Sequence, residues 1–100
     1  MILELKSFEM LRKEHGTDGR QAVLDFGDYH LSIINDGYGS DQGLYEIGVF
    51  EAAEGVASDM IELPGITEDG DIVKSYLTES AVDVIIKKLY LITGKTPVQI

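Results

Sequence analysis

Three successive segments between residues 21 and 51 show alternating apolar residues, and this alternation constrains the fold more than any other feature of the chain. In an extended strand, side chains point alternately to opposite faces, whereas a helix repeats every 3.6 residues. Short turn-forming stretches that contain Gly27-Asp28 and Gly37 separate the segments. The pattern therefore predicts three neighbouring strands, at residues 21–26, 29–34 and 44–51.

A short helix is expected before these strands and a fourth strand after them. Ser7 is a typical N-cap residue, and Gly16 is placed to end a helix over residues 8–15. Residues 59–63 alternate again and stop at Pro64-Gly65, which indicates a short strand. Residues 72–77 fit either a helical turn or an extended link.

The last predicted element is an amphipathic helix that follows Thr78, a suitable N-cap residue. Asp83 and Lys87 have the spacing of an ion pair on a helix surface. Gly94 is placed to end the helix, and residues 98–100 are expected to be a tail or an edge strand. The predicted buried stripe has helical spacing and consists of Val82, Ile85, Ile86, Leu89 and Ile92.

Together these elements predict a single α+β domain over residues 1–100. Its parts are a short N-terminal helix, a three- to four-stranded antiparallel meander, and a C-terminal helix packed on one sheet face. The connections are too short for parallel crossovers. A chain of this length buries about 65% of its unfolded surface, which is enough for one core.

Negative charge is concentrated in the middle of the chain. Residues 21–73 contain twelve Asp and Glu but no Lys or Arg, whereas the rest holds eight basic and six acidic residues. The net charge of −10 is therefore −12 in the middle and +2 outside it. A field of one sign attracts partners of the opposite sign and is costly through self-repulsion, so the stretch points to a basic partner.

Composition also argues against several classes of function. The chain has no cysteine, which excludes disulfides and thiolate metal sites and is typical of a cytoplasmic protein. No apolar run approaches the roughly 20 residues that span a bilayer. The middle of the chain lacks the basic footprint that nucleic acids and anionic membranes require, so we expect neither as a direct partner.

Catalytic and cofactor motifs do not survive inspection. Gly94-Lys95-Thr96 resembles the end of a phosphate-binding loop, but Leu89 stands where that motif needs glycine. His30 and Ser32 share a strand face, yet spacing alone does not supply an orienting acid. We therefore expect no cofactor, no metal site and no catalytic residues. A weak cation site in the acidic loops and an enzyme with an unrecognised carboxylate and histidine site remain alternatives.

The predicted partner-binding site has two parts. One is a set of acidic residues on the sheet face opposite the core, and the other is the glycine-rich loop at residues 35–43, where nothing in the local pattern buries Tyr38. Exposed aromatic residues often anchor protein contacts. The predicted site residues are Asp25, Glu46 and Glu62 on the face and Asp36, Tyr38 and Asp41 on the loop.

The chain shows two resemblances. The predicted order of helix, three strands and helix resembles double-stranded RNA-binding domains, but residues 78–81 (Thr-Glu-Ser-Ala) stand where those domains place lysines, so RNA binding is not implied. The run at residues 43–50 (Gly-Leu-Tyr-Glu-Ile-Gly-Val-Phe), with Glu62-Leu63-Pro64-Gly65, resembles small acidic accessory proteins of phages and prophages. Some proteins of that kind inhibit host nucleic-acid-binding or defence proteins by occupying basic surfaces.

The leading hypothesis is therefore a non-enzymatic acidic protein that engages a basic protein surface and acts as a nucleic-acid mimic or inhibitor. The alternative is a small soluble structural domain that associates with itself. Its contact would be an apolar cluster ringed by carboxylates, which consists of Val23, Ile34 and Phe50.

Overall fold

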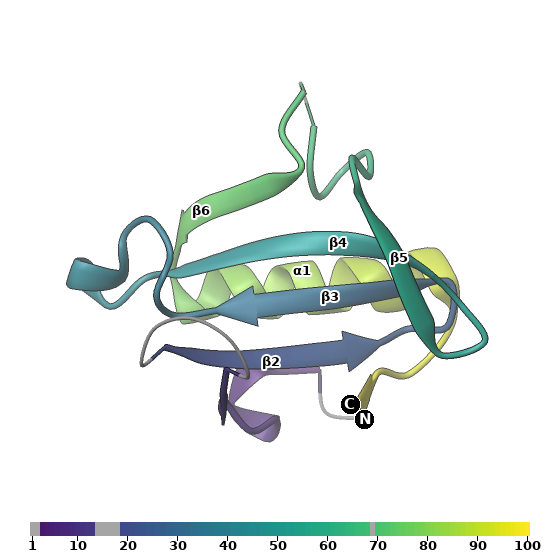
Figure 1. Cartoon of the computed structure of the whole chain (residues 1–100), viewed down its shortest axis with the longest axis horizontal. Coiled ribbons are helices and arrows are strands. Elements are labelled where there is room, and N and C mark those ends of the chain that lie inside the picture. Colours follow the sequence, from purple (N-terminus) through teal and green to yellow (C-terminus); the bar gives the residue numbers. More distant parts are fainter. Residues whose placement is uncertain (1–2, 14–18, 69) are drawn as a thin grey trace.

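A bent antiparallel sheet with one helix on one of its faces forms the fold (Figure 1). The structure is a computed structural model and describes residues 3–13, 19–68 and 70–100. The helix α1 spans Glu79–Thr93, and two short 3₁₀ turns, η1 and η2, span Leu5–Ser7 and Ser40–Gln42. The described residues form seven strands: β1 (Leu11–Arg12), β2 (Arg20–Asp25), β3 (Tyr29–Ile34), β4 (Tyr45–Ala53), β5 (Val56–Ile61), β6 (Val73–Leu77) and β7 (Val98–Gln99).

Strands β2, β3 and β4 form the centre of the sheet, and each outer edge of this centre is shared by two short strands. On the β2 edge, β1 pairs with residues 20–21 and β7 pairs with residues 24–25. On the β4 edge, β6 pairs with residues 45–48 and β5 pairs with residues 49–53. All of these pairings are antiparallel, so neighbouring strands are joined by hairpins or by excursions out of the sheet.

A long loop interrupts the strand that runs along β4. Ile61, the last residue of β5, lies opposite Val49, and Val73, the first residue of β6, lies opposite Gly48. Residues 62–68 and 70–72 therefore lie outside the sheet between these two pairings; we call them the excursion loop. Thr67, which is 2% exposed, holds its base by accepting a hydrogen bond from the backbone N–H of Leu63 at 2.8 Å.

Helix α1 begins and ends where the sequence predicts. The Thr78 hydroxyl accepts a hydrogen bond from the Ala81 N–H at 3.1 Å, and Gly94 adopts the left-handed conformation that ends the helix. Asp83 accepts a hydrogen bond from the Leu5 N–H at 2.7 Å and so ties η1 to α1. The buried side of α1 completes a core that includes Leu24, Phe26, Leu31, Ile33, Ile47, Val49, Val82, Ile85, Ile86 and Leu89.

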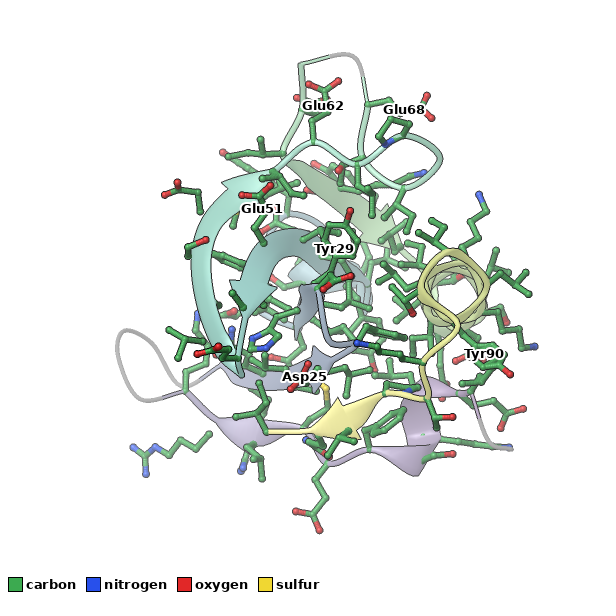
Figure 2. The ribbon with its side chains drawn as sticks, turned by 90° about the vertical axis from the view of Figure 1, so that its right-hand side faces the viewer. Asp25, Tyr29, Glu51, Glu62, Glu68 and Tyr90 are labelled. Carbon is green, nitrogen blue, oxygen red and sulfur yellow. The ribbon has the colours of Figure 1, made fainter. Side chains whose placement is uncertain are left out.

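The second face of the sheet, opposite α1, is partly covered by the chain itself. A register shift between Phe50 and Ala52 marks a bulge in the β4–β5 pairing, and bulges bend strands. Figures 1 and 2 agree that α1 lies on one side of β3 and β4 while β5 passes over the other side. Residues of β3 on this second face are accordingly buried: His30 is 3% and Ser32 is 9% exposed.

The predicted layout is wrong in two respects. Residues 8–13 are not helical: η1 ends at Ser7, and Leu11 pairs with Gln21 of β2; residues 14 and 15 of the predicted helix lie outside the described residues. The sheet has seven strands in place of three or four, since β1, β6 and β7 each add a short strand to an edge. The order of elements expected from the RNA-binding resemblance is therefore not present.

Candidate functional site

Asp25 lies beside a buried histidine and is not part of an open acidic face. Its Oδ1 atom accepts a hydrogen bond from the Gly27 N–H at 2.7 Å and lies 3.5 Å from Nε2 of His30. Nε2 of His30 is buried and has no hydrogen-bond partner among the described residues, because the contact with Asp25 does not meet hydrogen-bond geometry. Figure 2 shows Asp25 on the side of the sheet that carries β7, away from Glu62 and Glu68.

Asp36 and Glu46 are largely occupied by neighbouring side chains. Lys13 donates from Nζ to Asp36 Oδ2 at 2.9 Å, so this carboxylate is already neutralised by an ion pair. Glu46 is half-buried and accepts a hydrogen bond from the Ser75 hydroxyl at 2.6 Å. The charge of Asp36 is therefore compensated, whereas Glu46 is hydrogen-bonded but belongs to none of the ion pairs among the described residues.

Tyr38 and Tyr76 form the most exposed aromatic surface among the described residues. Their side chains are 72% and 60% exposed. Tyr76 packs against Gly39, the residue after Tyr38, where a Cβ atom would lie 2.9 Å from Cδ1 of Tyr76. Gly39 has a φ of +91°, so the absence of a side chain is required there both by space and by conformation.

Tyr76 itself has a rare backbone conformation. Its φ is +59°, in the left-handed region, which for a bulky residue is an outlier and costs about 1–3 kcal/mol. The cause lies in the β4–β6 pairing: Tyr45 faces Leu77 and Ile47 faces Lys74, so two residues stand opposite Glu46. Tyr76 lies in this bulge and is exposed, with its ring against Gly39.

The remaining predicted site residues lie apart from one another. Asp41 is exposed within η2, on the same loop as Tyr38. Glu62 follows β5, which ends at Ile61, and its carboxylate accepts a hydrogen bond from the Gly70 N–H at 3.1 Å in the excursion loop. The structure thus groups Asp36, Tyr38, Asp41 and Glu46 at one end of β4, and it places Asp25 and Glu62 elsewhere.

A second group of acids, which the sequence prediction did not select, surrounds the outermost strand. Glu51, Glu54 and Asp59 are exposed on the β4–β5 hairpin, and Glu62 follows at the end of β5. Because Ser58 of β5 donates from its hydroxyl to the Glu51 carbonyl, Glu51 lies directly beside this strand. We call β5 together with Glu51, Glu54, Asp59 and Glu62 the acidic edge. The Glu54-Gly55 turn was the sequence signal that could have located it.

The charges of the acidic edge are not compensated within the described part of the chain. Among residues 3–13, 19–68 and 70–100, ion pairs join Lys6 to Glu4 and Lys13 to Asp36, and His30 lies 3.5 Å from Asp25. None of them involves a carboxylate of the acidic edge. A basic partner would therefore meet carboxylates that have no ion-pair partner among the described residues, whereas Asp36 is already paired with Lys13.

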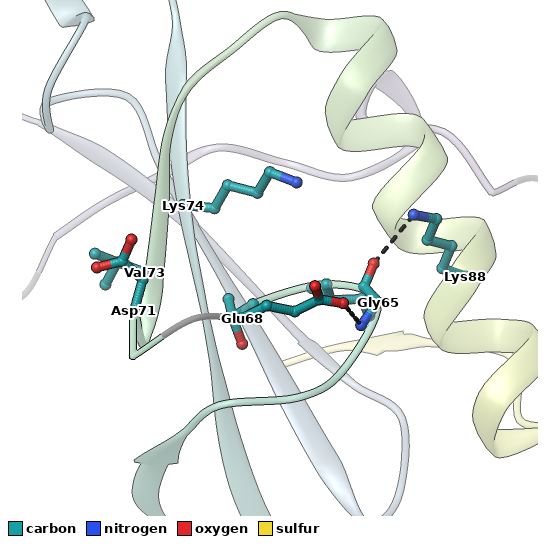
Figure 3. A pocket seen from close by; sticks show the side chains of 8 residues that line it. Gly65, Glu68, Asp71, Val73, Lys74 and Lys88 are labelled. Carbon is teal, nitrogen blue, oxygen red and sulfur yellow. Dashed lines mark hydrogen bonds between the residues drawn. The ribbon is translucent and has the colours of Figure 1, made fainter.

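A pocket of about 450 Å³ lies between the excursion loop, β6 and α1 (Figure 3). Glu68 accepts a hydrogen bond from the Gly65 N–H, and Lys88 donates from Nζ to the Gly65 carbonyl at 3.0 Å. Lys74 and Asp71 also line the pocket, so charges of both signs meet there. The lining does not single out an anionic or a cationic ligand.

The enzyme alternative gains little from this geometry. His30 and Asp25 do not line the pocket, and the Ser32 hydroxyl is used as the acceptor of a hydrogen bond from the Gln21 side chain at 2.8 Å. Among the residues that the structure describes, no three His, Cys, Asp or Glu side chains are grouped to hold a metal ion. Within the same residues, no helix has the length and apolar character to cross a membrane.

No known protein family, curated protein or solved structure matches this chain. The arrangement of its own residues therefore carries the functional argument alone.

Proposed function

We propose that this chain is a non-enzymatic binding protein whose acidic edge engages a basic surface of another protein. The observation that carries the proposal is the set of exposed carboxylates around β5, which no described Lys or Arg neutralises. Like charges this close repel one another, and a cationic partner relieves that repulsion while it steers the encounter. Proteins that bind nucleic acids carry basic surfaces of this kind, so nucleic-acid mimicry is the sharper form of the proposal.

A triple variant of the acidic edge tests this role. Glu51→Gln, Glu54→Gln and Asp59→Asn change the net charge from −10 to −7 and remove three exposed carboxylates. Each exposed ion pair is worth about 0.2–1 kcal/mol, so we expect the three substitutions together to lower the affinity for a basic partner about tenfold. The partner is first isolated by a pull-down from lysate of the source cell, with elution in a salt gradient. The affinity of the retained protein is then measured for the original chain and for each variant.

The matched control carries the same change of charge away from the acidic edge. Glu4→Gln, Glu9→Gln and Glu79→Gln also give a net charge of −7 and are expected to leave the affinity within about twofold, because long-range charge is screened beyond about 8 Å in physiological salt. Displacement of the retained protein by double-stranded DNA would support mimicry. Equal affinity of the two triple variants for the partner, or an affinity that does not fall as the salt concentration rises, would contradict the proposal.

Self-association is the second candidate, and the structure favours a different surface for it than the sequence did. Phe50 lies opposite Met60 under the β4–β5 hairpin, and Val23 and Ile34 are half-buried, so the predicted apolar cluster is not an open patch. By contrast Val84 and Leu91 are 50% and 78% exposed and lie seven residues apart on α1. Sedimentation at several protein concentrations tests this candidate, and a monomer throughout would contradict it.

A further inference from the structure

Strand β5 is the longest of the four edge strands of the sheet, and its outer side is unpaired among the described residues. Among the described residues it pairs with β4 alone, and residues 56–59 are exposed. An unpaired edge presents backbone donors and acceptors that can pair with another chain. Natural proteins protect such an edge with charged side chains, Pro, bulges or a very short strand. Strand β5 has six residues and contains neither Lys nor Pro, so its protection is limited to Asp59 and the bulge in its pairing with β4.

The hairpin geometry shows which backbone groups of β5 point outward. Glu54 and Gly55 both have positive φ, at 52° and 81°, which is the two-residue type I′ turn. In such a hairpin the flanking pair, Ala53 and Val56, exchanges both hydrogen bonds, and the next pair, Ala52 and Ala57, exchanges none. The Ala52 N–H accordingly donates to Asp28 on its other side at 2.9 Å. The N–H and C=O of Ala57 therefore point away from the sheet.

The charge around this edge selects the occupant. Glu51, Glu54, Asp59 and Glu62 surround β5 with negative charge, which opposes pairing with a second copy of the same acidic edge. The same carboxylates would lie beside Lys or Arg side chains of an added strand. Backbone hydrogen bonds supply affinity in strand addition, and the alternate side chains supply specificity.

We propose that β5 binds an extended, Lys- or Arg-rich segment of a partner protein as an additional strand, with Ala57 as a central backbone contact. This inference rests on the proposed function, because it uses the same carboxylates. It adds the mode of binding, in which backbone hydrogen bonds hold the partner segment along β5. A basic surface bound by charge alone needs no particular backbone conformation. A basic segment that adds a strand must be extended, so binding by charge alone and binding by strand addition can be distinguished by experiment.

The test uses the full chain and two synthetic peptides of equal charge. In one peptide Lys alternates with Val, which favours a strand. The other peptide has the same number of Lys but two Pro between successive Lys, so that neighbouring Lys N–H groups point to opposite sides and neither edge carries a row of donors. Affinity is measured by fluorescence anisotropy, and the exchange of the Ala57 amide hydrogen by NMR. We expect the Lys-Val peptide to bind about tenfold more tightly and to slow exchange at Ala57.

Ala57→Pro removes the outward N–H without touching a bond to β4, and proline is tolerated at such edge positions. We expect this variant to keep the fold, as judged by its circular dichroism and melting temperature, and to bind the Lys-Val peptide about tenfold less tightly. The matched control, Ala57→Thr, retains the N–H and a strand-forming side chain. It is expected to bind within about twofold of the original chain.

Other outcomes would overturn the inference, and they separate it from the proposed function. If both peptides bind equally and Ala57→Pro has no effect, strand addition fails while charge-based binding stands, provided the acidic-edge triple variant weakens both. If neither peptide binds, both proposals fail for basic segments. If the chain instead forms a dimer that Ala57→Pro abolishes, the occupant of the edge is a second copy and the inference is wrong.

Discussion

Replacing Phe26 by Ala is expected to lower the free energy of unfolding by about 3–5 kcal/mol. Phe26 is fully buried, with 0% exposure, at the point where the chain leaves β2 for the turn to β3. Truncation would remove the transfer free energy of the ring and leave a cavity that a close-packed core fills only in part. A domain of this size has about 5–15 kcal/mol of stability in total, so the loss is a large fraction of it.

Urea unfolding monitored by circular dichroism measures this loss. The matched control is Tyr38→Ala, which also removes an aromatic ring, but one that is 72% exposed; its effect is expected to stay within about 0.5 kcal/mol. A Phe26→Ala variant that lost less than about 1 kcal/mol would show that the core does not close around this residue. If the variant fails to fold at all, Phe26→Leu, which keeps an apolar side chain, gives a smaller loss that can be measured.

The centre of the sheet could be predicted from the sequence because it depends on a local pattern. The predicted strand at residues 29–34 is confirmed as β3, with the same limits, and Leu31 and Ile33 are buried as the alternation requires. The helix limits are equally local, since Thr78 and Gly94 act through their own backbone neighbours. Such signals need no knowledge of the rest of the fold.

The edges of the sheet could not be predicted in this way, because they depend on contacts distant in sequence. The expected N-terminal helix rested on Phe8 and Leu11, whereas Leu11 is paired with Gln21 in the sheet. A helix of eight residues has little stability of its own, so tertiary pairing decides the structure. The alternatives left open for residues 72–77 and 98–100 are likewise decided by distant pairing, since β4 and β2 pair with β6 and β7.

The candidate site shows the same division. Exposure of Tyr38 follows from its local surroundings and is confirmed. Which carboxylates are free, however, depends on partners far along the chain: Lys13 neutralises Asp36, and Ser75 binds Glu46. The acidic edge emerges only when β5 is seen as the outermost strand, which is a property of the whole sheet.

Replacing His30 by Leu is expected to raise the free energy of unfolding by about 1–3 kcal/mol, which is unusual for a buried residue. His30 is 3% exposed, and its Nε2 atom has no hydrogen-bond partner among the described residues. A buried polar atom without a partner costs its full desolvation free energy. Leu has a similar volume and no polar atom, so it removes this cost and keeps the contact with Phe50, which faces His30 on β4.

Urea unfolding at neutral pH checks this prediction, with Asp25→Asn as the companion variant. Asn retains the oxygen that accepts the Gly27 N–H but carries no charge, so it tests whether the 3.5 Å approach to His30 acts as an ion pair. A stabilised His30→Leu with a nearly neutral Asp25→Asn would show that the imidazole is kept at a cost to stability, as residues retained for function often are. Loss of stability in both variants, with strong coupling in the double variant, would instead make the pair structural and contradict the prediction.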